Sequence, residues 1–262
     1  MATAVFFHAH PDDECTSTGG TIAKAVAAGH RVVLVTATRG ELGECPEGLL
    51  ADGEELWERR VRELEAASRV LGVARGEFLG YRDSGMIGTP GNDDPACFWR
   101  ADVEEAAQRL AAICAEEQAD LLTVYDDNGA YGHPDHIQVH RVGVRAAEIA
   151  GIERVYEATM NRDHIQRLMR EMPMPEGVQA PDPEEMQGLG VAEDLITTCV
   201  DVRGFLDVKR QAMACHETQV GDIGFFLAMP PEAFEMGFGS EWYVRRGAVP
   251  SRPWGDDLFA DL

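Results

Sequence analysis

Two short polar segments of the chain contain residues that could do chemistry together. The first is Ala9-His10-Pro11-Asp12-Asp13-Glu14, in which three acidic side chains follow one imidazole. Acidic groups packed this closely repel one another unless protons or a cation neutralise them. His10 and Asp13, three residues apart across a tight turn, can converge on one metal ion. Asp12 is adjacent to Asp13 and should point elsewhere, so we do not expect both to bind the same ion.

The second segment, Tyr131-Gly132-His133-Pro134-Asp135-His136, offers a third ligand in His136. Two histidines and one carboxylate leave one position of a tetrahedral site open for water, which is typical of catalytic zinc sites. His133 is then free to act on a substrate, and Asp135 could hold an imidazole in orientation. Either segment alone is typical of a loop or a helix start, but the two together favour a shared metal site.

Both segments follow predicted buried strands, at Ala4–Ala9 and Leu121–Tyr125. In open parallel sheets, ligands bind outside the carboxyl ends of the strands. The two segments therefore have a suitable location before their chemistry is considered.

Short apolar runs alternate with helical patterns through the first 160 residues, which predicts right-handed strand–helix–strand units around a mainly parallel sheet. The predicted strands are Ala4–Ala9, Arg31–Thr36, Glu77–Leu79, Leu121–Tyr125 and Arg154–Ala158, and the predicted helices are Gly20–Ala28, Glu54–Leu71, Asp102–Glu117 and Asp135–Ala150. The fold class is therefore α/β, with a Rossmann-like sheet flanked by helices.

The second part of the chain is less regular. Pro175–Asp194 is rich in proline, glycine and acids and is expected to be a surface loop or lid. A strand at Thr197–Val202 and a helix at Leu206–His216 follow it, and Phe225–Leu262 is expected to be a loop-rich tail with apolar anchors. We expect one domain over residues 1–262, with a Rossmann-like core at 1–160 and a smaller irregular C-terminal portion at 161–262.

Composition excludes several classes of protein. Of the 262 residues 45% are hydrophobic, which excludes disorder, and 23 basic against 46 acidic residues give a net charge of −23. That charge argues against binding to nucleic acid or anionic membranes. No membrane span, signal peptide or Cys-x-x-Cys pair is visible among the six dispersed cysteines. We expect a soluble cytoplasmic protein, and assembly into a homo-oligomer stays open.

The paired motifs resemble those of the LmbE-like, or PIG-L, zinc N-deacetylase family, whose hallmarks are the segments present here as Ala9–Glu14 and His133–His136. The resemblance runs from residue 4 to about 220 and extends to Arg82–Met86 and Tyr131-Gly132. Within the family, the chain resembles the mycothiol-pathway branch, which comprises N-acetylglucosaminyl-inositol deacetylases and mycothiol S-conjugate amidases. The resemblance implies a Rossmann-like fold with an extra C-terminal portion and a small amino-sugar substrate.

The resemblance also implies a role for each motif residue. Zinc, or alternatively Fe²⁺ or another divalent ion, would be held by His10, Asp13 and His136. Asp12 would be the general base, and protonated His133 would stabilise the oxyanion, with Asp135 tuning it and Tyr131 assisting. The sugar site would be lined by Arg60, Asp83, Glu41 and Tyr131. Ser17 is also expected at the substrate site, and it resembles the deacetylases, because the amidases tend to have lysine there. The stretch between Gly43 and Glu58 differs from the deacetylase pattern.

Several residues have other interpretations. Arg60 could belong to a solvated helix face, and Asp83 could form a turn. A nucleophilic Cys15 would leave the motif acids unexplained. His216 and Gln219 could end a helix or reach the substrate.

The alternatives at the level of function are the amidase, an antibiotic-tailoring deacetylase, and a non-catalytic metal-containing sugar-binding protein. The last of these would not need an open ligand position or the additional carboxylate of Asp12.

Overall fold

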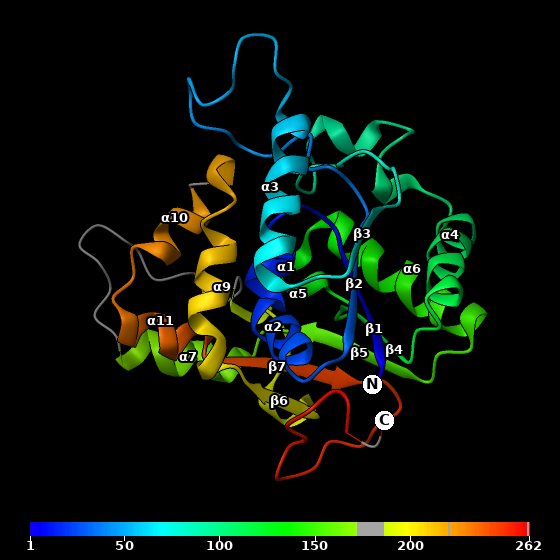
Figure 1. Cartoon of the computed structure of the whole chain (residues 1–262), viewed down its shortest axis with the longest axis vertical. Helices are drawn as coiled ribbons and strands as arrows, with labels where there is room; N and C mark the ends of the chain where they lie inside the picture. The colour runs from blue at the N-terminus through cyan, green and yellow to red at the C-terminus, as the bar shows by residue number, and fades with distance from the viewer. Residues whose placement is uncertain (172–185, 220, 261) are drawn as a thin grey trace.

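The computed structural model describes residues 1–171, 186–219, 221–260 and 262. Its centre is a seven-stranded sheet in the order β3-β2-β1-β4-β5-β7-β6 (Figure 1). The strands are β1 (Thr3–His8), β2 (Arg31–Thr36), β3 (Arg75–Phe78), β4 (Leu121–Tyr125), β5 (Arg154–Thr159), β6 (Thr198–Asp201) and β7 (Ser240–Arg245). Strands β1 to β5 pair in parallel, and β7 is antiparallel to both β5 and β6. The predicted α/β class is confirmed.

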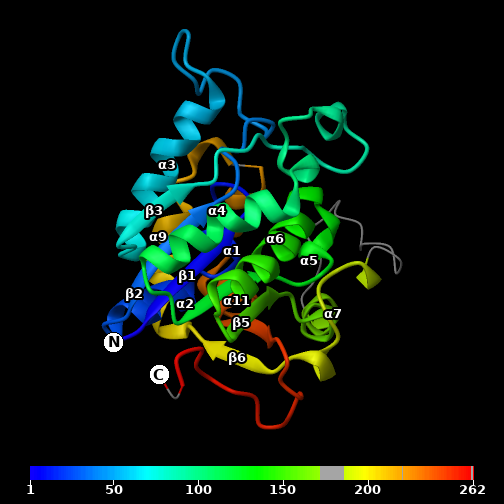
Figure 2. The ribbon, with the colours of Figure 1, turned by 90° about the vertical axis from the view of Figure 1, so that its right-hand side faces the viewer.

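Helices cover both faces of this sheet. Helices α1 (Asp13–Ser17), α2 (Gly19–Ala27), α3 (Leu56–Leu71) and α9 (Leu206–Met213) lie on one side, and α4 (Val103–Glu116) and α6 (Pro134–Ala150) lie on the other (Figures 1 and 2). The remaining helices are α5 (Gly129–Gly132), α7 (Arg162–Glu171), α10 (Asp222–Leu227) and α11 (Pro231–Phe238). Because both faces are covered, the central strand β4 is buried along its whole length, as is typical of parallel sheets.

Most predicted boundaries in the first 160 residues lie within two residues of the observed ones. Capping chemistry explains this, because Asp102 accepts a hydrogen bond from the Glu105 amide at the start of α4, and Gly72 and Gly151 end α3 and α6 in the left-handed conformation. The five-residue helix α1, which carries Asp13, was not predicted.

The predicted loop-rich tail is wrong. Residues 231–245 form α11 and β7, and β7 lies inside the sheet between β5 and β6. In the segment Ser-Glu-Trp-Tyr-Val-Arg, Glu241 and Tyr243 are buried on one face. Because one of these two buried residues is an acid, the sequence does not show the alternation of apolar and polar residues that is typical of a strand. The predicted helix Leu206–His216 ends at Met213, and His216 lies in the turn that follows. Of the predicted loop, residues 175–185 lie outside the described residues.

The buried acid in β7 joins the C-terminal portion to the first helical layer. Glu241 accepts hydrogen bonds from the Gly20 and Thr21 amides at the start of α2, at 2.9 and 2.8 Å. Lys209 of α9 donates to the same carboxylate at 2.6 Å, and the lysine side chain is only 1% exposed. Three elements far apart in the sequence therefore share one buried ion pair.

Replacement of Lys209 by methionine is expected to lower the free energy of unfolding by about 3 kcal/mol, because it leaves the buried Glu241 charge without its cation. Chemical denaturation monitored by circular dichroism measures this. The matched control is Lys24→Met, which removes the only other lysine and should change stability by no more than about 0.5 kcal/mol. Equal effects of the two substitutions would contradict the assignment.

All six cysteines lie in the described part of the chain and carry free thiols. Among the described residues, no helix combines the length and the apolar character that crossing a membrane requires.

Candidate metal centre and active site

The two polar segments meet where the strand order of the sheet reverses. Strands β1 and β4 are parallel neighbours, while the chain places β2 on the far side of β1 and β5 on the far side of β4. The loops after β1 and β4 therefore leave the sheet in opposite directions at its carboxyl edge, which is the usual ligand position in this architecture. His10 follows β1, and His136 lies in the first turn of α6 after β4.

A single carboxylate bridges the two histidines that were predicted to bind metal. Asp13 Oδ2 lies 3.6 Å from His10 Nδ1, and Asp13 Oδ1 lies 3.3 Å from His136 Nε2. These two distances are close to the separation of about 3.3 Å expected between tetrahedral zinc ligands at about 2.0–2.1 Å from the ion. Ligand atoms of His10, His133 and His136 also lie within 4.8 Å of one another, so the cluster offers suitable donors for a divalent cation. Burial raises the pKa of Asp13, but His136 and His10 outweigh it and hold the pKa well below its ordinary value.

The far nitrogen of His10 is held by two more acids. His10 Nε2 lies 3.1 Å from Asp135 Oδ2 and 3.5 Å from Asp83 Oδ1. Burial lowers the pKa of His10, but the charges of Asp83 and Asp135 outweigh it and hold the pKa well above its ordinary value. Asp135 is in turn fixed by Ser84, whose amide and hydroxyl donate to it at 2.9 and 2.7 Å. A carboxylate behind a histidine ligand is the usual support of metal sites. Asp135 also contacts His133 through its backbone amide, and the expected tuning of His133 by Asp135 stays a prediction.

The Asp12 side chain has a different partner from that of Asp13, as the adjacency of the two residues predicted. Its backbone has φ 111° and ψ −28°, a conformation that residues with a side chain rarely adopt. Its carboxylate lies 3.3 Å from Arg60 Nη2 and is 21% exposed. Burial raises the pKa of Asp12 to about 6 against the opposing charge of Arg60. A carboxyl group with a pKa near neutrality is suited to accept and return a proton.

The two ring nitrogens of His133 have different roles. Its Nδ1 accepts the Asp135 amide at 3.1 Å, which caps the start of α6. The ring proton therefore sits on Nε2. Burial and the nearby His10 and His136 lower the pKa of His133 to about 4, which favours a neutral imidazole over the protonated form we expected. A neutral His133 still offers an Nε2–H donor.

Tyr131 lies at the mouth of the cluster, with 43% of its surface exposed and its hydroxyl 3.5 Å from His136 Nε2. The loop that carries it is tightly built. Gly129 has φ 63°, and a side-chain carbon there would lie 2.5 Å from His136 Cβ. Asp126 Oδ1 accepts the Ala130 amide at 2.8 Å. Only glycine at 129 lets the loop approach α6 this closely.

The other residues predicted for the substrate site have different surroundings. Arg60 is buried and donates to the carbonyls of Pro11 and Gly40 at 2.5 and 2.9 Å, so the solvated-face interpretation of Arg60 is wrong. Asp83 is buried beside His10, and Glu41 accepts the Asp83 amide at 3.0 Å. Ser17 ends α1, one helical turn beyond Asp13, and within the described ranges its side chain has no hydrogen bond to the cluster.

A second group of possible ligands consists of Glu14, Cys15 and His216. The Cys15 thiol donates to Glu14 at 2.8 Å, and burial together with Glu14 raises the pKa of Cys15 well above its ordinary value. A protonated thiol is a poor nucleophile and a poor metal ligand. His216 Nε2 lies 2.7 Å from Glu14 Oε1. We therefore interpret the group as hydrogen-bonded. The contact joins residues 202 apart in the sequence, and no spacing signal predicts it.

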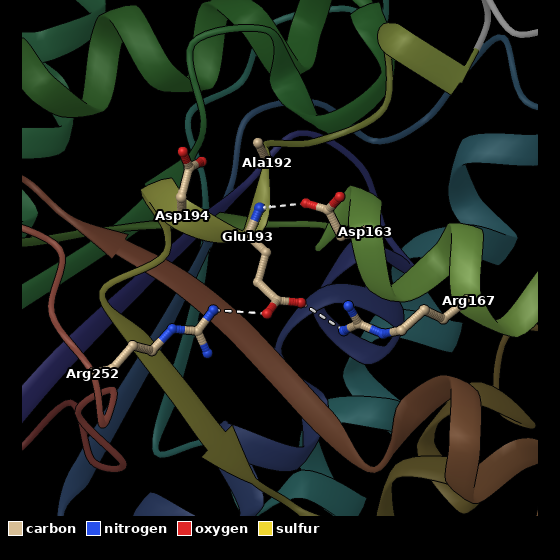
Figure 3. A pocket seen from close by; sticks show the side chains of 6 residues that line it. All are labelled: Asp163, Arg167, Ala192, Glu193, Asp194 and Arg252. Atoms are coloured by element: carbon tan, nitrogen blue, oxygen red, sulfur yellow. Dashed lines mark hydrogen bonds and ion pairs between the residues drawn. The ribbon is translucent and has the colours of Figure 1, made fainter.

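A cavity of about 440 Å³ lies elsewhere and is lined by Asp163, Arg167, Ala192, Glu193, Asp194 and Arg252 (Figure 3). Glu193 already pairs with both arginines, at 2.6 and 2.7 Å. None of the histidine–aspartate cluster lines this cavity, and we assign no chemistry to it.

Comparison with known proteins identifies the family. The family model described as PIG-L, GlcNAc-PI de-N-acetylase, matches residues 5–147. A Thermomonospora curvata protein named 1D-myo-inositol 2-acetamido-2-deoxy-alpha-D-glucopyranoside deacetylase is 45% identical over 92% of this chain and 89% of its own. A Thermobifida fusca protein of the same name is 43% identical over 97% of both chains. The chain belongs to the PIG-L family.

Among solved structures, an N,N'-diacetylchitobiose deacetylase from Pyrococcus horikoshii is similar with a TM-score of 0.55 and 25% identity, over 84% of this chain and 71% of that one. The 4-carboxy-2-hydroxymuconate hydratase of Pseudomonas putida has a TM-score of 0.61 and 19% identity, over 96% and 98%. The fold alone therefore does not define the reaction.

Proposed function

We propose that this protein is a metal-dependent N-deacetylase that hydrolyses the acetamide of an N-acetylglucosaminyl-inositol-type substrate to a free amine and acetate. The observation that carries the proposal is that Asp13 contacts both His10 and His136, while the neighbouring carboxylate of Asp12 contacts Arg60 and lies outside that set. The names of the relatives supply the substrate class.

The donor set favours zinc among divalent cations. Two imidazoles and one carboxylate are typical ligands of catalytic Zn²⁺, and they leave a position for water and substrate. Fe²⁺ is the alternative, since imidazole and carboxylate ligands also suit it. The ion would supply Lewis-acid polarisation of the acetamide carbonyl and a lower pKa for water.

The residues of the chain provide the proton transfers and the anion stabilisation. Asp12 accepts a proton from the attacking water as the carbon–oxygen bond forms. The Nε2–H of neutral His133 donates to the oxygen on which negative charge develops, and the Tyr131 hydroxyl lies on the same side. The proton taken up by Asp12 is then given to the leaving nitrogen when the carbon–nitrogen bond breaks.

The role of His133 can be separated from its capping role. Asparagine is a good helix cap but lacks a donor at the Nε2 position. His133→Asn is therefore expected to lower kcat by about 10²–10³-fold while the melting temperature and metal content stay near wild type. Steady-state amine release, thermal unfolding and elemental analysis measure the three quantities. A His133→Asn variant with the wild-type kcat would end the oxyanion assignment.

The substrate contacts and setting are part of the proposal. Arg60 contacts Asp12, Asp83 contacts His10, and Glu41 accepts the Asp83 amide. We propose that the sugar hydroxyls contact these three residues. The product is a cationic amine, which suits a protein of net charge −23. Six free thiols fit a reducing compartment, so we propose a cytoplasmic location.

A substrate panel tests the proposed specificity. Amine release is measured on 1D-myo-inositol 2-acetamido-2-deoxy-α-D-glucopyranoside, on N-acetylglucosamine and on a mycothiol S-conjugate at equal concentrations. We expect the highest kcat/KM on the inositol glycoside. A higher value on the thiol conjugate would favour an amidase, and turnover of none of the three would favour tailoring of a natural product.

A further inference from the structure

Glu14 is a buried acid that the proposed chemistry does not use. Its side chain is about 1% exposed, so it cannot reach a substrate. It accepts hydrogen bonds from the Asp12 amide at 2.9 Å, from the Cys15 thiol at 2.8 Å and from His216 Nε2 at 2.7 Å. A buried carboxylate lowers the stability of the folded protein unless hydrogen bonds of this kind compensate its charge. The structure therefore holds Glu14 at this position through several directed contacts.

The amide that Glu14 accepts belongs to the peptide unit that sets the orientation of Asp12. The other polar atom of the same unit, the Pro11 carbonyl oxygen, accepts from Arg60 Nη2 at 2.5 Å. The Pro11–Asp12 peptide plane is thus held from both ends by charged side chains. This matters because Asp12 has φ 111°, and a residue with a side chain in such a conformation costs about 1–3 kcal/mol that the surroundings must offset.

His216 comes from a distant segment that is itself anchored. It lies in the turn after α9, and the imidazole is 1% exposed. In the same turn, the amide and hydroxyl of Thr218 donate to Glu63 of α3 at 2.9 and 2.5 Å. The Gln219 side chain donates to the Glu44 carbonyl at 3.0 Å. The turn therefore brings a fixed imidazole to Glu14.

We propose that Glu14 and His216 are positioning residues that hold the Asp12 carboxylate in its catalytic orientation by fixing the Pro11–Asp12 peptide. The proposal rests on the proposed function of Asp12 as the base. Neither residue exchanges a proton with the substrate. The contacts connect the turn after α9 to the backbone of Asp12 through His216 and Glu14.

The test compares two substitutions of His216 in two backgrounds. His216→Leu removes the donor to Glu14, whereas His216→Gln keeps an N–H donor of similar reach. We expect His216→Leu to lower kcat by about 10- to 100-fold, the effect of a small misplacement of a reacting group, with KM and metal content within about twofold of wild type. His216→Gln should recover most of the loss. Glu217→Gln, at an exposed position of the same turn, is the matched control and should keep kcat near wild type.

The dependence on Asp12 distinguishes positioning from a general structural effect. In the Asp12→Asn background there is no base to misplace, so His216→Leu should cause no further loss of the residual rate. Equal losses in both backgrounds, or the wild-type kcat in a folded His216→Leu variant, would overturn the proposal. If His216→Leu does not fold, Glu14→Gln is measured in the same two backgrounds with the same expectation.

A crystal structure of His216→Leu adds a measurement that does not depend on activity. We expect Asp12 to leave the left-handed region and its carboxylate to move away from Arg60. An unchanged Asp12 backbone would overturn the proposal even if the protein turns over none of the panel substrates. In that case the absent turnover by wild type would count separately against the proposed function.

Discussion

His136→Ala is expected to abolish stoichiometric metal binding. His136 Nε2 faces Asp13 at 3.3 Å, opposite His10, so its removal leaves two ligands where a catalytic site needs three. Loss of a group that only supports a ligand costs about 10–100-fold in metal affinity, and loss of a direct ligand should exceed 100-fold. Elemental analysis of the purified variant and competition with a chromophoric chelator measure this, and amine release should fall to background.

The matched control is His140→Ala, one turn further along α6. His140 Nδ1 contacts the Tyr125 carbonyl at 2.9 Å and lies outside the cluster. This variant should keep one metal ion per chain. Full metal content in His136→Ala would remove that residue from the ligand set. Two ions per wild-type chain would instead indicate that Glu14, Cys15 and His216 also bind metal.

Asp12→Asn is expected to separate catalysis from metal binding. Asparagine preserves the size of the side chain but cannot accept the proton of the attacking water. General-base catalysis contributes about 10²–10⁴-fold, so kcat should fall by that factor. Metal content should stay at the wild-type level, because the Asp12 carboxylate contacts Arg60 and is not among the proposed metal ligands.

Asp127→Asn makes the same change of charge at the same edge of the sheet. Asp127 is exposed and follows β4 closely, so this variant should keep the wild-type rate. A slow Asp127→Asn variant would indicate that net charge governs turnover. A fast Asp12→Asn variant would refute the base assignment directly.

Local patterns in the sequence predicted much of the fold. The strands Arg31–Thr36 and Leu121–Tyr125 were predicted with their observed bounds. A short apolar run between turn residues, with helical segments before and after it, is typical of a buried parallel strand. The strand β7 was missed because Glu241 is buried, and a buried acid reverses the expected alternation of polar and apolar faces. Its burial is tolerated only because Lys209 and the start of α2 surround the carboxylate.

The ligand set could be proposed from sequence because His10 and Asp13 are close along the chain and each segment follows a strand. The residues that support these ligands could not be predicted from the sequence. Asp135 reaches His10 across 125 residues and Ser84 across 51. Such contacts connect loops, which have no periodic signal, and they depend on the fold as a whole. The lowered pKa of His133 likewise follows from burial and two neighbouring imidazoles.

The central claim is tested most directly by acetate and amine release from 1D-myo-inositol 2-acetamido-2-deoxy-α-D-glucopyranoside before and after metal removal. The wild-type protein should release the two products in equal amounts. Dialysis against a chelator should abolish the reaction, and one equivalent of Zn²⁺ or Fe²⁺ per chain should restore it. Unchanged turnover in the metal-free protein, or no product from the fully loaded protein, would contradict the account.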